Sequence, residues 1–236
     1  MHKKIVIHQP NTFPSLKVIQ KIACGDVWVV YDDVQFVRRE WQNRIMLRNL
    51  KNPLNRFWLT IPIEKTIYGM SKINEVKIFD YETFHKKFNE LLFNLYRTSK
   101  FWKEINHYAE GFPQYKNVQV NLSDYNVKTL IRLLEILEIK IDILFSSDLK
   151  VEGGRNQKLI NICKKINGDI YICGEGGKSY LDNELFLSQD ILVYWHSWNE
   201  QYFYSQYGNI MWRNVSFIDF IARYGINELK KVLIIK

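Results

Sequence analysis

Two short apolar segments, separated by one amphipathic stretch, constrain the fold of this chain more than any other feature. Residues 5–7 read IVI and residues 27–31 read VWVVY. Residues 12–24 between them place apolar side chains at helical spacing, and Gly25 is suited to ending that helix. Strand, helix and strand form a βαβ unit with parallel strands. Because both strands are continuously apolar, we expect helices to cover both faces of the sheet.

The rest of the chain repeats these two kinds of pattern without a proline- or glycine-rich linker. We expect strands at 56–63, 73–79, 142–149 (running into a loop), 169–174 and 191–198, and helices at 81–108, 126–139, 157–166 and 215–225. The prediction is a single α/β domain over 1–236, with a mostly parallel sheet flanked by helices in a Rossmann-like or nucleotidyltransferase-like arrangement. Within it, approximately residues 81–140 would form a helical insertion or cap.

Composition narrows the class of protein and its partners. The chain is 47% hydrophobic and 25% charged, which suits a packed core, and its net charge of +8 favours anionic partners such as nucleotides or RNA. The lysines are scattered, so a solvated basic surface is the alternative reading of that charge. Three cysteines without CxxC spacing predict reduced cytoplasmic thiols, and the histidine spacing predicts no metal site. No signal peptide or membrane span is expected.

Polar motifs follow three of the predicted strands. HQPNTFP follows residues 5–7, DDVQF follows residues 27–31, and GEGGKSY follows residues 169–173. In open α/β sheets, ligands bind in the crevice beyond the carboxyl ends of the strands. We therefore expect these three motifs, although distant in sequence, to converge on one crevice.

The first motif combines two prolines with three polar side chains. Proline fixes φ, so the loop should be stiff and hold His8, Gln9 and Asn11 in place. The helix that follows would offer its N-terminal N–H groups to a phosphate. The alternative is that His8 only stabilises the turn.

The second motif, DDVQFVRREWQNR, opens with two adjacent carboxylates. Neighbouring side chains in an extended chain point to opposite sides. We expect one of Asp32 and Asp33 to face the crevice, and the other to cap a helix or pair with Arg38 or Arg39. Further candidates for substrate binding are Gln35, Arg38, Asn43 and Arg44. The alternative is a surface loop tied by Asp–Arg pairs.

The third motif, GEGGKSYLD, adds Gly174, Lys178 and Tyr180 as possible ligand contacts. It is neither GxGxxG nor a Walker A sequence, and glycines in tight turns explain it as well. His196, at the end of a predicted strand, would be either a second crevice histidine or a histidine packed in an aromatic cluster.

Together these residues resemble the WbqC-like protein family. The resemblance is carried by IHQPNTFP, KIACGDVWVVYDDVQFVRREWQNR and LTIPI, and then by SSDLKVEGGRNQKLINICKKINGDIYICGEGGKSYLD and YFYSQYGNIMWRNVSFIDFIARYG. It covers nearly the whole chain, and the middle helical region is the least distinctive part. Thr12 and Ser15 depart from the expected aromatic and large apolar residues, which would alter the mouth of the pocket.

The resemblance implies a cytoplasmic bacterial enzyme of surface-polysaccharide or O-antigen biosynthesis. The expected reaction is N-acyl or N-aminoacyl transfer, for example of glycine, to the amine of a nucleotide-linked amino-dideoxysugar. The donor would be aminoacyl-tRNA, acyl-coenzyme A or an acyl-carrier protein, without a tightly bound cofactor. His8, Asp32 or Asp33 would be the base. Oxyanion donors would be Asn11, Gln35 or Asn43, and diphosphate ligands Arg44 and Lys178.

Two other functions fit the same residues. ATP-dependent nucleotidyl transfer or carboxylate adenylation would use the aspartates as magnesium ligands. A non-catalytic protein that binds a nucleotide sugar or tRNA would need no base at all. The residues do not identify the sugar, the donor or the oligomeric state.

Overall fold

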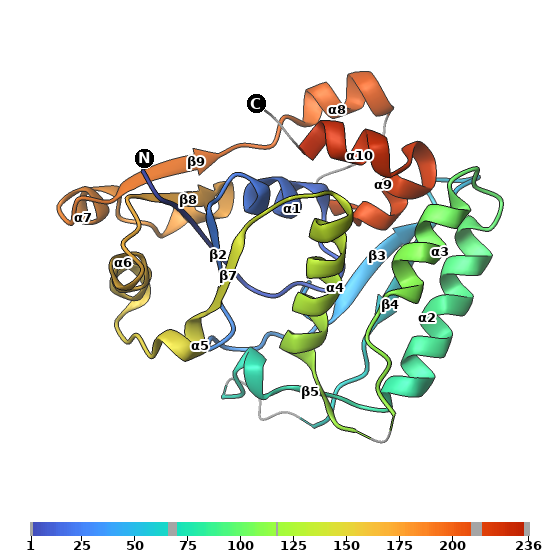
Figure 1. Cartoon of the computed structure of the whole chain (residues 1–236), viewed down its shortest axis with the longest axis horizontal. Helices are drawn as coiled ribbons and strands as arrows, with labels where there is room; N and C mark the ends of the chain where they lie inside the picture. Colours follow the sequence, from blue (N-terminus) through green and yellow to red (C-terminus); the bar gives the residue numbers. More distant parts are fainter. Residues whose placement is uncertain (1, 66–69, 117, 209–213, 234–236) are drawn as a thin grey trace.

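The computed structural model describes residues 2–65, 70–116, 118–208 and 214–233. At its centre lies a five-stranded sheet whose neighbouring strands all pair in parallel (Figure 1). The strand order is β7-β2-β1-β8-β9, with bounds Asp142–Phe145, Val27–Val30, Lys4–His8, Ile170–Gly174 and Leu192–His196. The predicted class, an α/β protein with a mostly parallel sheet flanked by helices, is confirmed.

Side chains alternate between the two faces of the sheet, and both faces are covered. Val6 and Trp28 pack into a large core cluster, in which α1, α9 and α10 are among the helices that contribute residues. Ile5 and Val27 point the other way, into a smaller cluster with α6 and α7. The bounds of these helices are Leu16–Ala23 (α1), Phe217–Tyr224 (α9), Ile226–Leu233 (α10), Arg155–Lys165 (α6) and Asn183–Leu187 (α7). Burial on both faces explains why the strands are continuously apolar.

Three helices stand to one side of the sheet (Figure 1). They are α2 (Tyr81–Tyr96), α3 (Trp102–Glu110) and α4 (Leu122–Ile136), and their apolar faces join the large core cluster. The loop after β1 is anchored among them. Phe13, in the left-handed region with φ 41°, is buried and stacks on Phe88 of α2 with ring centroids 4.7 Å apart. The backbone strain at Phe13 is thus offset by aromatic packing.

Two of the expected strands do not join the central sheet. The segment predicted at 56–63 forms β4 (Arg56–Thr60), which pairs antiparallel with β3 (Arg44–Arg48), a strand not predicted. The segment predicted at 73–79 forms a 3-10 turn and then a two-residue strand, β5 (Lys77–Ile78), paired with β6 (Val120–Asn121). Local alternation indicates a strand but not its partner, so these segments were wrongly assigned to one sheet.

Further differences lie at short elements. The predicted loop at the end of 142–149 is a helical turn, α5 (Ser146–Leu149), and a helix not predicted, α8 (Glu200–Tyr207), follows β9. Residues 209–213, inside the last stretch of the family resemblance, lie outside the described residues. Within the described ranges, we find no helix with the length and hydrophobicity needed to cross a bilayer.

The strand order creates a topological switch point between β1 and β8. The connection after β1 leads to α1 on one face, and the connection after β8 leads to α7 on the other face. The loops that leave these adjacent strands therefore diverge, which opens a crevice at their carboxyl ends.

Candidate functional site

Two cavities lie at this switch point and share part of their walls. The first, about 310 Å³, is lined among others by Lys17, Lys21 and Cys173, and we call it the lysine cavity. The second, about 630 Å³, is lined among others by Tyr31 and Arg155, and we call it the tyrosine cavity. Both are lined by Ile7, His8, Tyr171 and Tyr180. They are two parts of one crevice, with His8 at their junction.

His8 contacts the amine of Lys21 inside this crevice. Lys21 Nζ lies 3.0 Å from His8 Nδ1, and the Lys21 side chain reaches there from the last turn of α1. Burial, and then the neighbouring amine, hold the pKa of His8 well below its usual 6.5. Burial also lowers the pKa of Lys21 to about 8. Near neutral pH the pair therefore carries one proton, which Lys21 holds.

The loop that carries His8 is fixed by hydrogen bonds from the helical side of the molecule. Asn11 Nδ2 lies 3.3 Å from His8 Nε2. Thr12 Oγ1 donates to the Gln42 carbonyl, and Asn126 Nδ2 on α4 donates to the carbonyls of Pro10 and Gln42. The loop is therefore held through both backbone and side chains. Thr12 is buried and takes part in this network.

Gln9 also has a defined neighbour and lines the tyrosine cavity. Gln42 Nε2 donates to Gln9 Oε1 at 2.9 Å, and Gln42 Oε1 accepts from the backbone N–H of Val37. Gln42 thus joins the first motif to the second. Gln35 of the second motif lines the same cavity.

The two adjacent aspartates point away from the His8 crevice. Asp32 is buried, and its carboxylate accepts from Ser146 Oγ, Ser147 N and Ser147 Oγ. Asp33 accepts from Ser146 Oγ and pairs with Lys158 Nζ on α6 at 2.6 Å. Asp33 lines a neighbouring cavity of about 600 Å³ near β7. Neither Asp32 nor Asp33 is among the described residues that line the lysine cavity or the tyrosine cavity.

Three other predicted ligands of the second motif also lie outside the crevice. Arg38 is exposed in the segment before β3. Asn43 is buried and donates to the Ile61 carbonyl. Arg44 places its guanidinium carbon 4.3 Å from the ring centroid of Trp58 on β4.

Of the three ligand contacts predicted in the third motif, two line the crevice. Gly174 lines the lysine cavity, and Tyr180 lines both cavities. Lys178 is exposed on the 3-10 helix Glu175–Ser179 and, among the described residues, lines neither cavity. His196 is buried, with Nε2 3.1 Å from Gln20 Oε1, and burial lowers its pKa to about 4. It is a packed core histidine rather than a second crevice histidine.

Several residues that line the crevice were not predicted from the sequence. Lys17 and Lys21 are four residues apart on α1 and so share one helix face, which is a signal that spacing could have revealed. Lys17 pairs with Glu175 at 2.5 Å across the lysine cavity. Arg155 lies with its guanidinium carbon 4.9 Å from the Tyr180 ring centroid. This contact joins residues 25 positions apart in sequence, so no local pattern predicts it.

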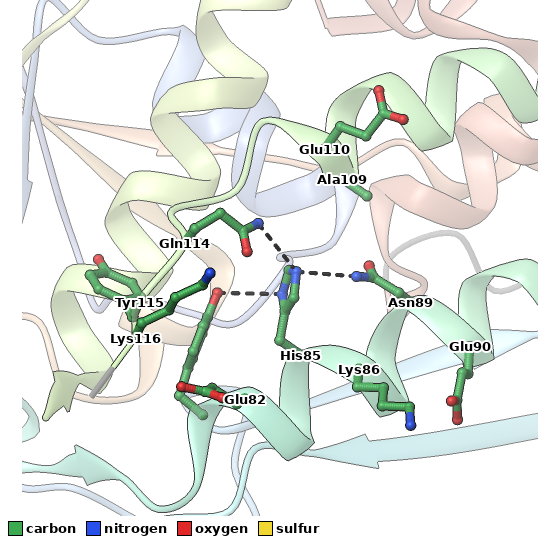
Figure 2. Close-up of a pocket in the computed structure, with 11 residues that line it drawn as sticks. Glu82, His85, Lys86, Asn89, Glu90, Ala109, Glu110, Gln114, Tyr115 and Lys116 are labelled. Atoms are coloured by element: carbon green, nitrogen blue, oxygen red, sulfur yellow. Dashed lines mark hydrogen bonds between the residues drawn. The ribbon is translucent and has the colours of Figure 1, made fainter. Parts of the chain in front are cut away.

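Another hollow, of about 620 Å³, is lined by side chains of α2, α3 and residues 114–116 (Figure 2). His85 stands at its centre, with Nδ1 3.3 Å from Tyr81 Oη and Nε2 3.1 Å from Asn89 Nδ2. Tyr81 donates its own hydroxyl proton to the Pro113 carbonyl, so it accepts from Nδ1–H of His85. Both ring nitrogens are thus tied by protein groups.

Within the ranges that the structure describes, no group of three or more His, Cys, Asp or Glu side chains is placed to hold a metal ion. The cysteines at 24, 163 and 173 are free thiols.

Comparison with known proteins places this architecture in a family. The model of the WbqC-like protein family matches residues 9–231. The chain is also similar to "Uncharacterized protein Rv1507c" of Mycobacterium tuberculosis (strain ATCC 25618 / H37Rv), with 28% identity over 224 residues, 94% of each chain. No solved structure matches it. The family match spans nearly the whole chain, and the chain belongs to the WbqC-like protein family.

Proposed function

We propose that this member of the WbqC-like protein family is a cytoplasmic transferase that moves an acyl or aminoacyl group onto the amine of a nucleotide-linked amino-dideoxysugar. The pathway would be surface-polysaccharide biosynthesis. The observation that carries the proposal is the contact between His8 and Lys21 at the junction of two cavities. Amide formation from a protonated amine needs a base, and a lysine with a pKa of about 8 is unprotonated, and so able to act as that base, to an extent that grows as the pH rises toward 8.

In the proposed reaction, the sugar amine enters the lysine cavity and loses a proton to Lys21 in its unprotonated form, while His8 stays neutral beside it. Its nitrogen then attacks the carbonyl carbon of the acyl donor, and a C–N bond forms as the bond to the leaving group breaks. The pair returns the proton to the leaving oxygen or sulfur. Asn11 holds the His8 ring from the other side, at Nε2, which keeps the imidazole aligned with the amine.

The tyrosine cavity suits the nucleotide part of the acceptor. Its volume, about 630 Å³, lies within the usual range of ligand sites. Tyr31 and Tyr180 offer flat rings for a base or sugar, and Arg155 offers a fixed positive charge for the diphosphate. In this proposal Arg155 takes the role that the sequence suggested for Arg44 and Lys178.

The contacts of the aspartates favour transfer over adenylation. Adenylation would use Asp32 and Asp33 as magnesium ligands, but Asp32 accepts three hydrogen bonds from serines and Asp33 is paired with Lys158. A third function, non-catalytic binding of a nucleotide sugar or tRNA, would need no base and so would not explain the contact between His8 and Lys21.

The test is mass spectrometry of dTDP- and UDP-linked amino sugars incubated with the protein. ATP, amino acids, tRNA with a bacterial extract, acyl-coenzyme A and acyl-carrier protein are supplied together and then omitted one at a time. A protein-dependent mass gain on the amine supports the transferase, and the omission that abolishes it identifies the donor. The same gain must be lost in Lys21→Met and kept in Lys165→Gln, a matched change of an exposed lysine at the end of α6. Binding without any gain would instead support the non-catalytic function.

A further inference from the structure

The segment from 37 to 60 has a local excess of positive charge. It holds six of the 33 Arg and Lys residues and one acidic residue, Glu40. Arg48 is buried, and the other five basic residues are exposed or half-buried. The segment consists of the loop that ends the second motif and the antiparallel pair β3–β4. We call this unit the basic ribbon. A concentration of charge on one short unit marks a surface suited to a polyanion.

The outer face of the basic ribbon is also aromatic. In the register of the pair, Met46 lies opposite Trp58, while Ile45 and Leu47 point the other way into the core. Trp58 is 48% exposed, and the Arg44 guanidinium lies over its ring at 4.3 Å. The Trp41 ring lies next to it, with centroids 5.6 Å apart. Exposed rings beside guanidinium groups are the elements that stack unpaired nucleobases.

The basic ribbon is joined to the crevice by hydrogen bonds. The backbone N–H of Thr12 donates to the Trp41 carbonyl at 2.8 Å, and Gln42 donates to Gln9. Val37, where the basic ribbon begins, lines the tyrosine cavity together with His8. A strand of nucleotides that stacks on Trp58 would therefore have a short route to the His8–Lys21 pair.

We propose that the basic ribbon binds the single-stranded end of an RNA and directs its 3′ terminus toward the crevice. The proposal rests on the proposed function and names the donor class: an acyl group esterified to RNA. The ester bond at the terminal ribose would break as the amide forms, and the proton from the amine would pass through the His8–Lys21 pair to the ribose oxygen. A free nucleotide could stack on the same rings but is too short to contact the whole basic ribbon. Comparing the affinity for an RNA strand with that for a mononucleotide therefore distinguishes the two ligands.

The test is fluorescence anisotropy with a labelled 12-nucleotide RNA ending in CCA, titrated at several salt concentrations, alongside a mononucleotide. We expect Trp58→Ala to weaken RNA binding by roughly 10-fold, since stacking of one base is lost. Arg44→Gln should weaken it and reduce the salt slope by about one, since one phosphate contact is lost. The matched controls, Tyr202→Ala, also 48% exposed, and Lys165→Gln, should bind as the wild type does. Thermal melting checks that each variant is folded.

Three results would overturn the inference: no RNA binding at low salt, equal losses in the controls, or a change of oligomeric state in Trp58→Ala with unchanged RNA affinity. Mononucleotide affinity that falls as much as RNA affinity would assign the basic ribbon to a free nucleotide instead. These outcomes leave the proposed transferase intact if acyl-coenzyme A or a carrier protein supports the mass gain. Conversely, RNA binding without any transfer would reject the transferase and keep the RNA surface.

Discussion

Lys21 Nζ, in the last turn of α1, lies 3.0 Å from Nδ1 of His8, the last residue of β1. Lys21 is only 8% exposed. Burial lowers the pKa of both groups, and the neighbouring Lys21 amine lowers the pKa of His8 further. Such a contact contributes little to the stability of the fold, because the charged form of Lys21 loses solvation there. It is well suited to accepting and returning a proton.

Replacing His8 should separate catalysis from binding. His8→Gln keeps a polar side chain at the junction but removes the imidazole, so we expect the rate of amide formation to fall roughly 100-fold or more. Affinity for the nucleotide sugar, measured by calorimetry, should change little. His85→Gln on α2, outside the crevice, is the matched control and should keep full activity. Equal rates in the two variants would remove His8 from the mechanism.

The pH dependence of the proposed reaction follows from Lys21. Its pKa is about 8, so the amine is mostly protonated below that value and free to accept a proton above it. Initial rates at saturating donor should therefore rise with pH and level off above about 8. In Lys21→Met the remaining activity should lack this rise. A wild-type profile that falls between pH 7 and 9 would contradict the assignment.

Lys21 should also make stability depend on pH. Its pKa drops from 10.5 to about 8 on folding, so between these values the unfolded chain binds the extra proton. The free energy of unfolding should then increase as pH rises through this window, by about 3 kcal/mol for the full shift. Urea unfolding of wild type and Lys21→Met at pH 7.5, 8.5 and 9.5 isolates this contribution by difference. A constant difference between the two proteins would show that Lys21 keeps its ordinary pKa.

Asp32 should matter for stability more than an exposed acid does. Its buried carboxylate ties the end of β2 to Ser146 and Ser147 after β7. Asp32→Ala leaves the two Ser147 donors unpaired, while Ser146 Oγ keeps Asp33 as its acceptor, and we expect a loss of about 3 kcal/mol in the free energy of unfolding. Asp124→Ala, at an exposed acid on α4, should cost under about 1 kcal/mol. Similar losses in both would mean that the Asp32 contacts contribute little.

Gly177 and Cys173 should be coupled. A Cβ at Gly177 would lie 2.1 Å from Cys173 Sγ, while the next nearest atoms, Trp195 Cζ3 and Cys173 Cβ, are at 3.4 and 3.8 Å. Gly177→Ala alone should therefore cost about 1–3 kcal/mol by overpacking. Adding Cys173→Ala removes the clashing sulfur and should restore much of that loss, so the two changes will not be additive. Additive losses in urea unfolding would show that the cost of Gly177→Ala does not come from the Cys173 sulfur.

The amino-acid sequence by itself determined the elements around the crevice. Continuous apolar runs at 5–7, 27–31 and 170–173 predicted buried parallel strands, because the pattern of burial on two faces is a local property. The stiff loop after the first run placed His8 and Gln9 at a strand end, and both line the crevice. The ribbon of β3 and β4 was missed as a separate unit, because alternation does not name a pairing partner.

Only the tertiary structure decided which strand ends meet. The order β7-β2-β1-β8-β9 sets β8 beside β1, so Gly174 and Tyr180 line the crevice with His8. Asp33, at the end of β2, turns toward β7 and Lys158 instead. Lys21 joins His8 because the parallel crossover returns α1 across the sheet. Strand order, crossover and long-range pairing depend on the packing of the whole chain, which no local spacing of residues encodes.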